Sequence, residues 1–146
     1  INKNNSQTSI IKEQKRTLEN KKINSINKII TEPLKIADHI IFLYRRSDCS
    51  NCIKEGYQII KKIDSISGIQ ICTIASSSKI ERDQDRYNYQ KPIYTDEHDI
   101  IRKELNFIYT PVLIRLNSDN KIKSLFYPGK ENEKKERNFV NKLIAN

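Results

Sequence analysis

The stretch IIFLYRRSDCSNC, residues 40–52, decides the fold of this chain. Its apolar start predicts a buried strand over residues 39–44, and apolar residues of helical period then predict a helix over residues 49–63. Cys49 and Cys52 therefore lie in the first turn of a helix, where unpaired N–H groups and the helix dipole favour a thiolate. The second thiol lies about one helical turn beyond the first, close enough to form a disulfide. The motif indicates redox chemistry.

The composition narrows the classes of function. At 146 residues the chain is long enough for one domain with an appendage, and 36% of its residues are hydrophobic. Its net charge is +9, yet no run of five or more Lys or Arg occurs, and no aromatic residues alternate with the basic ones. A surface that stacks bases requires such aromatic residues, so we expect no nucleic-acid partner. The charge indicates a solvated, lysine-rich surface, with attraction to an anionic membrane surface as the alternative.

The N-terminal part is predicted to be an appendage. Residues 1–8 are rich in Asn, Ser and Lys and predict a disordered tether, whereas residues 9–30 carry a weaker helical pattern that Pro33 ends. We expect residues 1–33 to form a tether and an accessory helix. A stalk that leads into a docked last turn is slightly favoured over a fully packed helix.

Strands and helices alternate along the rest of the chain. The predicted elements are a strand over 69–75, a short helix over 76–89, an extended segment over 91–94, a helix over 95–105, strands over 107–116 and 122–127, and a helix over 131–145. Strands separated by helices require parallel crossovers, and the late hairpin adds antiparallel strands. The sequence therefore predicts an α/β fold with a mixed central β-sheet flanked by helices.

With these features the chain resembles the thioredoxin superfamily, and within it the extracytoplasmic thiol–disulfide oxidoreductases of the TlpA/ResA type. CSNCIKE at residues 49–55 is similar to that group's C-x-x-C-x-x-E signature. Thr110-Pro111 opens a strand where thioredoxins hold a cis-proline beside the dithiol, and the insert after the second strand is a third match. The resemblance implies a thioredoxin-like three-layer sandwich over residues 34–146, with an extra N-terminal helix.

The resemblance also implies roles for five residues. Cys49, nearer the helix end, would attack as a thiolate, and Cys52 would resolve the mixed disulfide. Thr110 and Pro111 would hold an extended substrate beside the dithiol, and Glu55 would carry a proton to or from the second thiol. These roles describe a thiol–disulfide oxidoreductase that exchanges disulfides with protein thiols and disulfides, works as a monomer, and needs no cofactor and no metal.

The start of the chain bears on its location. The chain begins at Ile1, contains no Met, and has no stretch of 18 apolar residues that could span a membrane. A removed secretory leader or lipid-anchoring segment explains this start. A sequence that covers only part of a longer protein explains it equally well. Together with the resemblance, it predicts an extracytoplasmic protein of the periplasm or cell envelope, tethered to the membrane through a removed N-terminal segment. A membrane-bound or extracytoplasmic redox partner fits that location.

Two positions depart from the family pattern. Family members usually carry an aromatic residue, often Trp, directly before the first cysteine, whereas this chain has Asp48. A carboxylate beside Cys49 disfavours the thiolate, which the two arginines of the bend and the helix N-terminus partly offset. The dipeptide Ser50-Asn51 lacks the Pro that is common in the family. These departures leave the redox potential and the direction of electron transfer open.

Other interpretations of the cysteines stay open. The first is a non-catalytic thioredoxin-like binding module with a static disulfide, and the second is a copper-handling carrier that uses His98, although such carriers space the pair one residue wider. A zinc site needs four ligands, and the remaining soft donors are Cys72, His39 and His98. Cys72 lies in a predicted buried strand, which indicates an inert core thiol.

Overall fold

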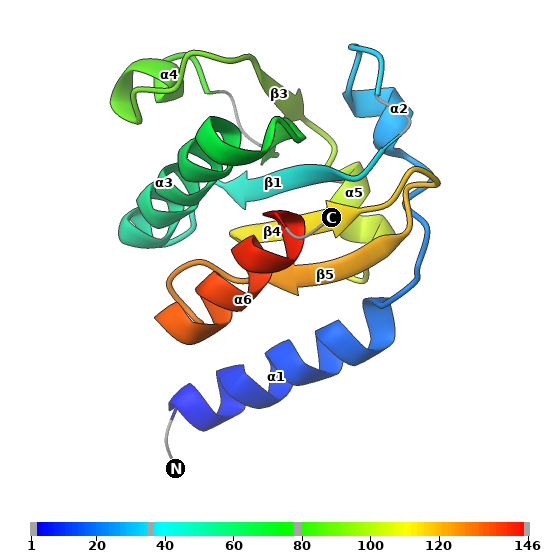
Figure 1. The fold of residues 1–146 in the computed structure, drawn as a ribbon, viewed down its shortest axis with the longest axis vertical. Helices are drawn as coiled ribbons and strands as arrows, with labels where there is room; N and C mark the ends of the chain where they lie inside the picture. Colours follow the sequence, from blue (N-terminus) through cyan, green and yellow to red (C-terminus); the bar gives the residue numbers. More distant parts are fainter. Residues whose placement is uncertain (1–2, 35–36, 78–79, 145–146) are drawn as a thin grey trace.

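Five strands form one sheet in the order β3-β2-β1-β4-β5 in the computed structural model, which describes residues 3–34, 37–77 and 80–144 (Figure 1). The strands are β1 (His39–Arg45), β2 (Gln70–Ser76), β3 (Ile93–Asp96), β4 (Val112–Leu116) and β5 (Ile122–Phe126). The helices are α1 (Lys3–Leu18), α2 (Ile26–Ile29), α3 (Ser50–Ser67), α4 (Asp83–Arg86), α5 (Ile100–Glu104) and α6 (Glu133–Ile144). The predicted alternation of strands and helices is confirmed.

The strand directions are mixed, as the sequence predicts. β1 pairs in parallel with β2, and β2 pairs in parallel with β3. On its other side β1 pairs with β4 in antiparallel orientation, and β4 pairs with β5 in the same way. β1 therefore has a neighbour on both sides. It is also covered on both faces, which is why its residues form a continuous apolar run instead of an alternating one.

Helices cover both faces of the sheet and complete a three-layer sandwich (Figure 1). α3 and α6 pack on one face, where Phe42 of β1 and Phe126 of β5 are buried with Phe139 of α6. α1, α2 and α5 pack on the other face, where Ile41 of β1 is buried with Ile101 of α5. Residues of β1 thus alternate between two apolar layers, as the two-residue period of a strand requires.

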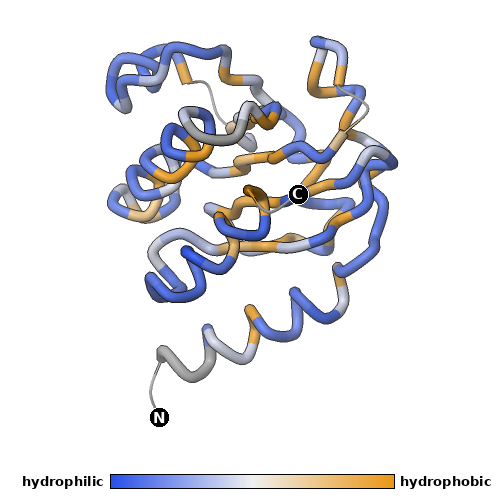
Figure 2. The backbone as a smooth tube through the Cα atoms, in the orientation of Figure 1, coloured by the Kyte–Doolittle hydropathy of each residue, from blue (hydrophilic) through white to orange (hydrophobic). Residues whose placement is uncertain are grey.

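The hydropathy of the chain follows these layers (Figure 2). β1 is largely apolar, whereas α3 carries apolar residues on one side and polar residues on the other (Figure 2). Gly56 lies on the inward side of α3, and a Cβ atom at this position would overlap the ring of Phe42. The missing side chain therefore lets α3 approach β1 closely. This packing fixes the start of α3, and with it the dithiol, relative to the sheet.

The expectation of one helix over residues 9–30 is wrong. α1 ends at Leu18, and Asn20 has a positive φ of 66°. The chain then runs beside β5, where the N–H of Asn20 donates to the carbonyl of Ile122 at 2.8 Å and the N–H of Ile122 donates to Lys21 at 2.9 Å. These bonds replace helical ones over the connection, so α2 forms as a separate short turn.

The expected disordered tether and stalk are also corrected. α1 begins at Lys3, so helix replaces the tether from there on, while residues 1–2 lie outside the described residues. Ile11 and Leu18 of α1 are 5% and 3% exposed and belong to the apolar cluster of the sheet. The hydrophobic effect therefore holds α1 against the domain.

Other boundaries differ locally. The predicted helix over 76–89 is reduced to α4, and residues 78–79 lie outside the described residues. The predicted strand over 107–116 begins only at Val112, and its first residue, Phe107, has a φ of 58°, which strands do not adopt. Among the helices of the described ranges, none has the length and apolar character needed to cross a membrane.

Candidate active site

The dithiol lies where the central strand β1 ends and helix α3 begins. Cys49 directly precedes the helix, and its sulfur accepts a hydrogen bond from the backbone N–H of Cys52 at 3.3 Å. Both thiols are free. Cys49 is exposed to solvent, whereas Cys52 is buried with 5% of its surface exposed. A large partner can therefore reach the first sulfur directly, while the second is shielded behind it.

The surroundings shift the pKa values of the two thiols in opposite directions. Hydrogen bonds from the thiol and the backbone N–H of Cys52 lower the pKa of Cys49. The backbone of Asn51 and the charge of Lys130 act in the same direction. Burial raises the pKa of Cys52 to about 11, and its hydrogen bond to Cys49 and the Glu55 carboxylate add to the rise. Because the thiolate is the nucleophile, these shifts favour Cys49 as the attacking group.

Asp48 ties the turn before the dithiol to a loop that is distant in sequence. Its carboxylate accepts a hydrogen bond from the backbone N–H of Arg45 at 2.7 Å and another from the hydroxyl of Thr110 at 2.9 Å. The Nε of Arg45 donates to the same hydroxyl at 3.1 Å. Only 4% of the Asp48 side chain is exposed. The carboxylate that we expected to oppose the Cys49 thiolate is therefore engaged by these partners, and the pKa of Cys49 is lowered.

The loop that Asp48 holds carries two of the predicted site residues. The peptide bond between Thr110 and Pro111 is cis, and β4 begins directly after it at Val112. Both residues are buried. The hydrogen bond between Thr110 and Asp48 brings this loop next to the turn that leads into Cys49.

A second loop closes over the inner thiol. The carboxylate of Glu55, which is half-buried in α3, accepts a hydrogen bond from the backbone N–H of Gly129. Gly129 has a φ of +77°, and a Cβ atom there would lie 2.9 Å from the Cβ of Cys52 and overlap its sulfur. Only a glycine therefore allows the backbone to approach Cys52 this closely, and Glu55 holds the loop in this position.

The N-terminal helix reaches the same region. The side-chain oxygen of Gln14 in α1 accepts a hydrogen bond from the backbone N–H of Tyr109 at 3.2 Å and another from the hydroxyl of Tyr127 at 2.6 Å. Tyr109 directly precedes Thr110, and Tyr127 begins the loop that carries Gly129. One side chain of α1 therefore supports both loops that flank the dithiol.

Comparison with solved structures identifies the fold of the chain. In a scan against protein-family models none matches the chain, and a search of curated proteins finds no match either. A secreted Mycobacterium tuberculosis disulfide oxidoreductase homologous to E. coli DsbE superposes with a TM-score of 0.59, at 14% identity, over 77% of this chain and 84% of that one. The thioredoxin domain of a Bacteroides vulgatus thiol-disulfide oxidoreductase gives a TM-score of 0.58, at 16% identity, over 75% and 81%. The chain has the thioredoxin-like fold. StoA from Bacillus subtilis also matches, with a TM-score of 0.53, at 19% identity, over 72% and 84%.

In this thioredoxin-like fold the remaining soft donors lie at separate elements. His98 is exposed in the turn before α5, and His39 is buried at the start of β1. Cys72 is 1% exposed in β2, and burial raises the pKa of its thiol to about 12, in keeping with an inert core thiol. Across residues 3–34, 37–77 and 80–144, no three His, Cys, Asp or Glu side chains group as metal ligands would.

The sequence does not reveal the roles of three residues that shape the candidate site of this thioredoxin-like fold. Gln14 lies in a segment that the sequence predicts to be a stalk, and Gly129 lies between the predicted strand over 122–127 and the predicted helix over 131–145. Asp48 was noticed as a departure from the family, but its contact with Thr110 spans 62 positions. The available signals were the carboxylate in place of an aromatic residue and a glycine in a chain that has three.

Proposed function

We propose that the chain is a thiol–disulfide oxidoreductase that exchanges disulfides with protein substrates. The observation that carries this proposal is the asymmetry of the dithiol. An exposed thiol with a lowered pKa lies at a helix N-terminus, in front of a buried thiol with a raised pKa. The thioredoxin-like fold supports the proposal, since structural neighbours include thiol-disulfide oxidoreductases.

The exchange has two steps. In the reductive direction, the Cys49 thiolate attacks one sulfur of a substrate disulfide, that S–S bond breaks, and the released substrate thiolate takes a proton. Cys52 then loses its proton and attacks the Cys49 sulfur of the mixed disulfide. A Cys49–Cys52 disulfide forms, and the second substrate thiolate leaves and is protonated. The substrate has gained two electrons from the dithiol and two protons, one from Cys52 and one from the solvent, which takes up the proton of Cys49 when its thiolate forms. The oxidative direction reverses each step.

The loops beside the dithiol supply binding and proton transfer in this proposal. Thr110 and Pro111 hold the extended backbone of the substrate at the start of β4. Glu55 exchanges a proton with Cys52, because its carboxylate anchors the loop that closes over this thiol and raises the pKa of the thiol. The effect of this carboxylate, which favours the protonated thiol in the resting state, supports its role as the group that accepts the proton when Cys52 attacks.

An extracytoplasmic setting completes the proposal. Protein disulfides form and persist outside the cytosol, and the structural neighbour from Mycobacterium tuberculosis is described as secreted. In this setting the partners are protein thiols and disulfides, together with a membrane-bound or extracytoplasmic redox protein. Residues 34–146 form the thioredoxin-like unit, α1 and α2 pack on its sheet, and the protein acts as a monomer tethered to the membrane.

Changing Cys52 to serine tests the proposed function. The variant keeps the attacking thiol but lacks the resolving one, so a mixed disulfide with a substrate should accumulate. The reduced variant is mixed with insulin, whose chains are joined by disulfides. We expect a covalent adduct on a non-reducing gel that dithiothreitol releases, and no adduct when Cys49 is also replaced by serine.

The static-disulfide module predicts a different outcome. In that case wild-type protein would keep a disulfide between Cys49 and Cys52 that resists strong reductants, and the Cys52→Ser variant would form no adduct. Stoichiometric copper binding that is lost in His98→Ala would instead indicate a copper carrier. Either result would replace the oxidoreductase proposal.

Removing the Asp48 carboxylate should weaken both stability and exchange. Asp48→Ala leaves the N–H of Arg45 and the hydroxyl of Thr110 without this acceptor, which should cost about 1–3 kcal/mol of unfolding free energy. The loop that carries Pro111 also loses its link to the dithiol turn, so adduct formation in the Cys52→Ser background should slow. Urea unfolding and the rate of adduct formation measure the two effects.

A double-mutant cycle provides the control for Asp48. Thr110→Val removes the hydroxyl that donates to the carboxylate and keeps the shape of the side chain. If the two residues act through their shared hydrogen bond, the double variant should lose less stability than the sum of the single variants, by about 0.5–3 kcal/mol. Strict additivity would contradict the coupling between the two loops.

A further inference from the structure

A groove of about 390 Å³ opens beside the dithiol. It lies between the first turns of α3 and residues 86–88 of the connection from β2 to β3. Ser50 and Asn51, the two residues between the cysteines, are among the residues that line it. A polypeptide bound in this groove therefore contacts Ser50, the residue that follows Cys49.

One wall of this groove contains two tyrosines that stack on each other, the half-buried Tyr87 and the buried Tyr57. The rings of Tyr57 and Tyr87 stack with their centroids 4.4 Å apart and their planes 10° from parallel. The ammonium of Lys61 donates to the carbonyl of Tyr87 at 2.9 Å, which holds the connection against α3. Behind them, the hydroxyl of Tyr57 donates to Tyr44 and the hydroxyl of Tyr44 donates to Asp83, each at 2.7 Å. The wall is thus fixed before any substrate arrives, which lowers the entropic cost of binding.

The rim of the groove is cationic. Lys54, Lys61 and Arg86 are exposed there, and no lining residue in the described part of the chain carries a carboxylate. Arg86 keeps 55% of its side chain exposed, although its guanidinium lies 3.8 Å from the buried carboxylate of Asp83. Lys130 adds a positive charge near Cys49, whose pKa it lowers. Like charges that surround a cleft attract ligands of the opposite sign.

We propose that this groove binds an acidic segment of the substrate protein, next to the cysteine that Cys49 attacks. The inference rests on the proposed function and specifies the class of its substrates. Carboxylates of the substrate bind at the rim of Lys54, Lys61 and Arg86. The carbon chains of these acidic substrate residues lie along the wall that contains the tyrosines. Electrostatic complementarity of this kind raises the association rate and selects partners by charge.

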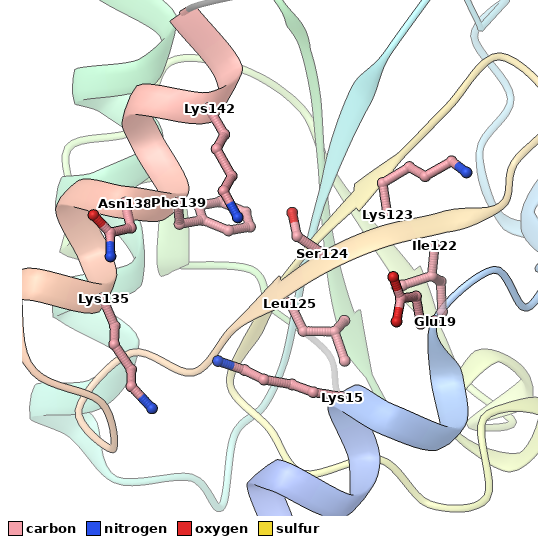
Figure 3. Close-up of a pocket in the computed structure, with 10 residues that line it drawn as sticks. All are labelled: Lys15, Glu19, Ile122, Lys123, Ser124, Leu125, Lys135, Asn138, Phe139 and Lys142. Atoms are coloured by element: carbon pink, nitrogen blue, oxygen red, sulfur yellow. The ribbon is translucent and has the colours of Figure 1, made fainter.

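A second basic hollow supplies the control (Figure 3). This hollow, of about 340 Å³, lies between α1, β5 and α6, and Figure 3 shows Lys15, Lys123 and Lys135 along it. The described residues that line the two hollows are all different. Lys15 and Lys135 are already paired with Glu131, at 2.5 and 3.8 Å. Reversing the charge of Lys123 changes the net charge of the protein as much as reversing Lys54, but outside the dithiol groove.

The test compares two synthetic peptides, each with one cysteine in a mixed disulfide with thionitrobenzoate. Glutamates flank the cysteine in one peptide and glutamines in the other. Reduced wild-type protein should release thionitrobenzoate from the glutamate peptide about tenfold faster at low ionic strength. The ratio of the two rates should approach one at about 1 M salt, where the Debye length is about 3 Å. Lys54→Glu and Arg86→Glu should each lower the ratio about two- to fivefold, and Lys123→Glu should leave it unchanged.

The other outcomes distinguish the failure of the acidic groove from the failure of disulfide exchange. Equal rates for the two peptides with wild-type protein overturn the acidic groove and leave disulfide exchange intact. An equal fall of the ratio in Lys123→Glu and Lys54→Glu assigns the preference to the overall charge, which also overturns the groove. Release from neither peptide overturns the proposed function itself, because Cys49 then attacks no disulfide.

Discussion

Replacing Cys49 with serine should lower the rate of disulfide exchange by a factor on the order of 10³ or more. A serine hydroxyl is not ionised near neutral pH, so the attacking thiolate is lost. Cys52 cannot take over, because it is buried and burial raises the pKa of its thiol to about 11. The rate is measured as the reduction of insulin by the protein in the presence of dithiothreitol, compared with wild type.

Two controls accompany the Cys49 variant. Cys72→Ala should keep the wild-type rate, because the thiol of Cys72 is buried in β2. In wild-type protein, alkylation by iodoacetamide should rise with pH in two steps, since the thiolate fraction grows above each pKa. The first step, from Cys49, should lie below the usual thiol value of about 8.5, and the second near 11. Exchange that survives in Cys49→Ser would contradict the assignment of the nucleophile.

The sequence predicts those parts of the fold that local patterns determine. Both β1 and α3 are visible in the sequence, because burial on both faces leaves a continuous apolar run in β1 and burial of one side leaves a helical period in α3. The break between α1 and α2 leaves no such period. It depends on backbone hydrogen bonds that join Asn20 and Lys21 to Ile122, which lies about a hundred positions further along the chain.

In the candidate site too, local features can be predicted from the sequence, whereas contacts between distant segments cannot. The position of Cys49 and Cys52 at a strand-to-helix elbow is a local property, so spacing and periodicity were sufficient to predict it. The contact of Asp48 with Thr110 joins two loops, and the contact of Gly129 with Cys52 joins a loop to a helix. Such contacts exist only after the sheet has assembled, and a single sequence carries no pattern that reports them.

Gly129→Ala should destabilise the protein and uncover the inner thiol. The added Cβ would overlap the sulfur of Cys52 and lie 3.2 Å from its Cα, at a φ of +77° that L side chains rarely adopt. We expect a loss of about 1–2 kcal/mol from the backbone conformation and about 1–3 kcal/mol more from the overlap. Urea unfolding measures the loss. If the loop moves away instead, Cys52 becomes exposed, and the alkylation step near pH 11 should shift to lower pH because burial is the main cause of the raised pKa.

Gly68→Ala separates the two contributions. Gly68 ends α3 with a φ of +63°, and a Cβ atom there would meet nothing within 4 Å. This variant should therefore lose only the backbone contribution, about 1–2 kcal/mol, and should leave the alkylation of Cys52 unchanged. The difference between the two alanine variants measures the contact between the loop and the inner thiol. Equal losses in Gly129→Ala and Gly68→Ala, with the second alkylation step unmoved, would mean that the loop does not shield Cys52, and Glu55 would then have no loop to hold over the thiol.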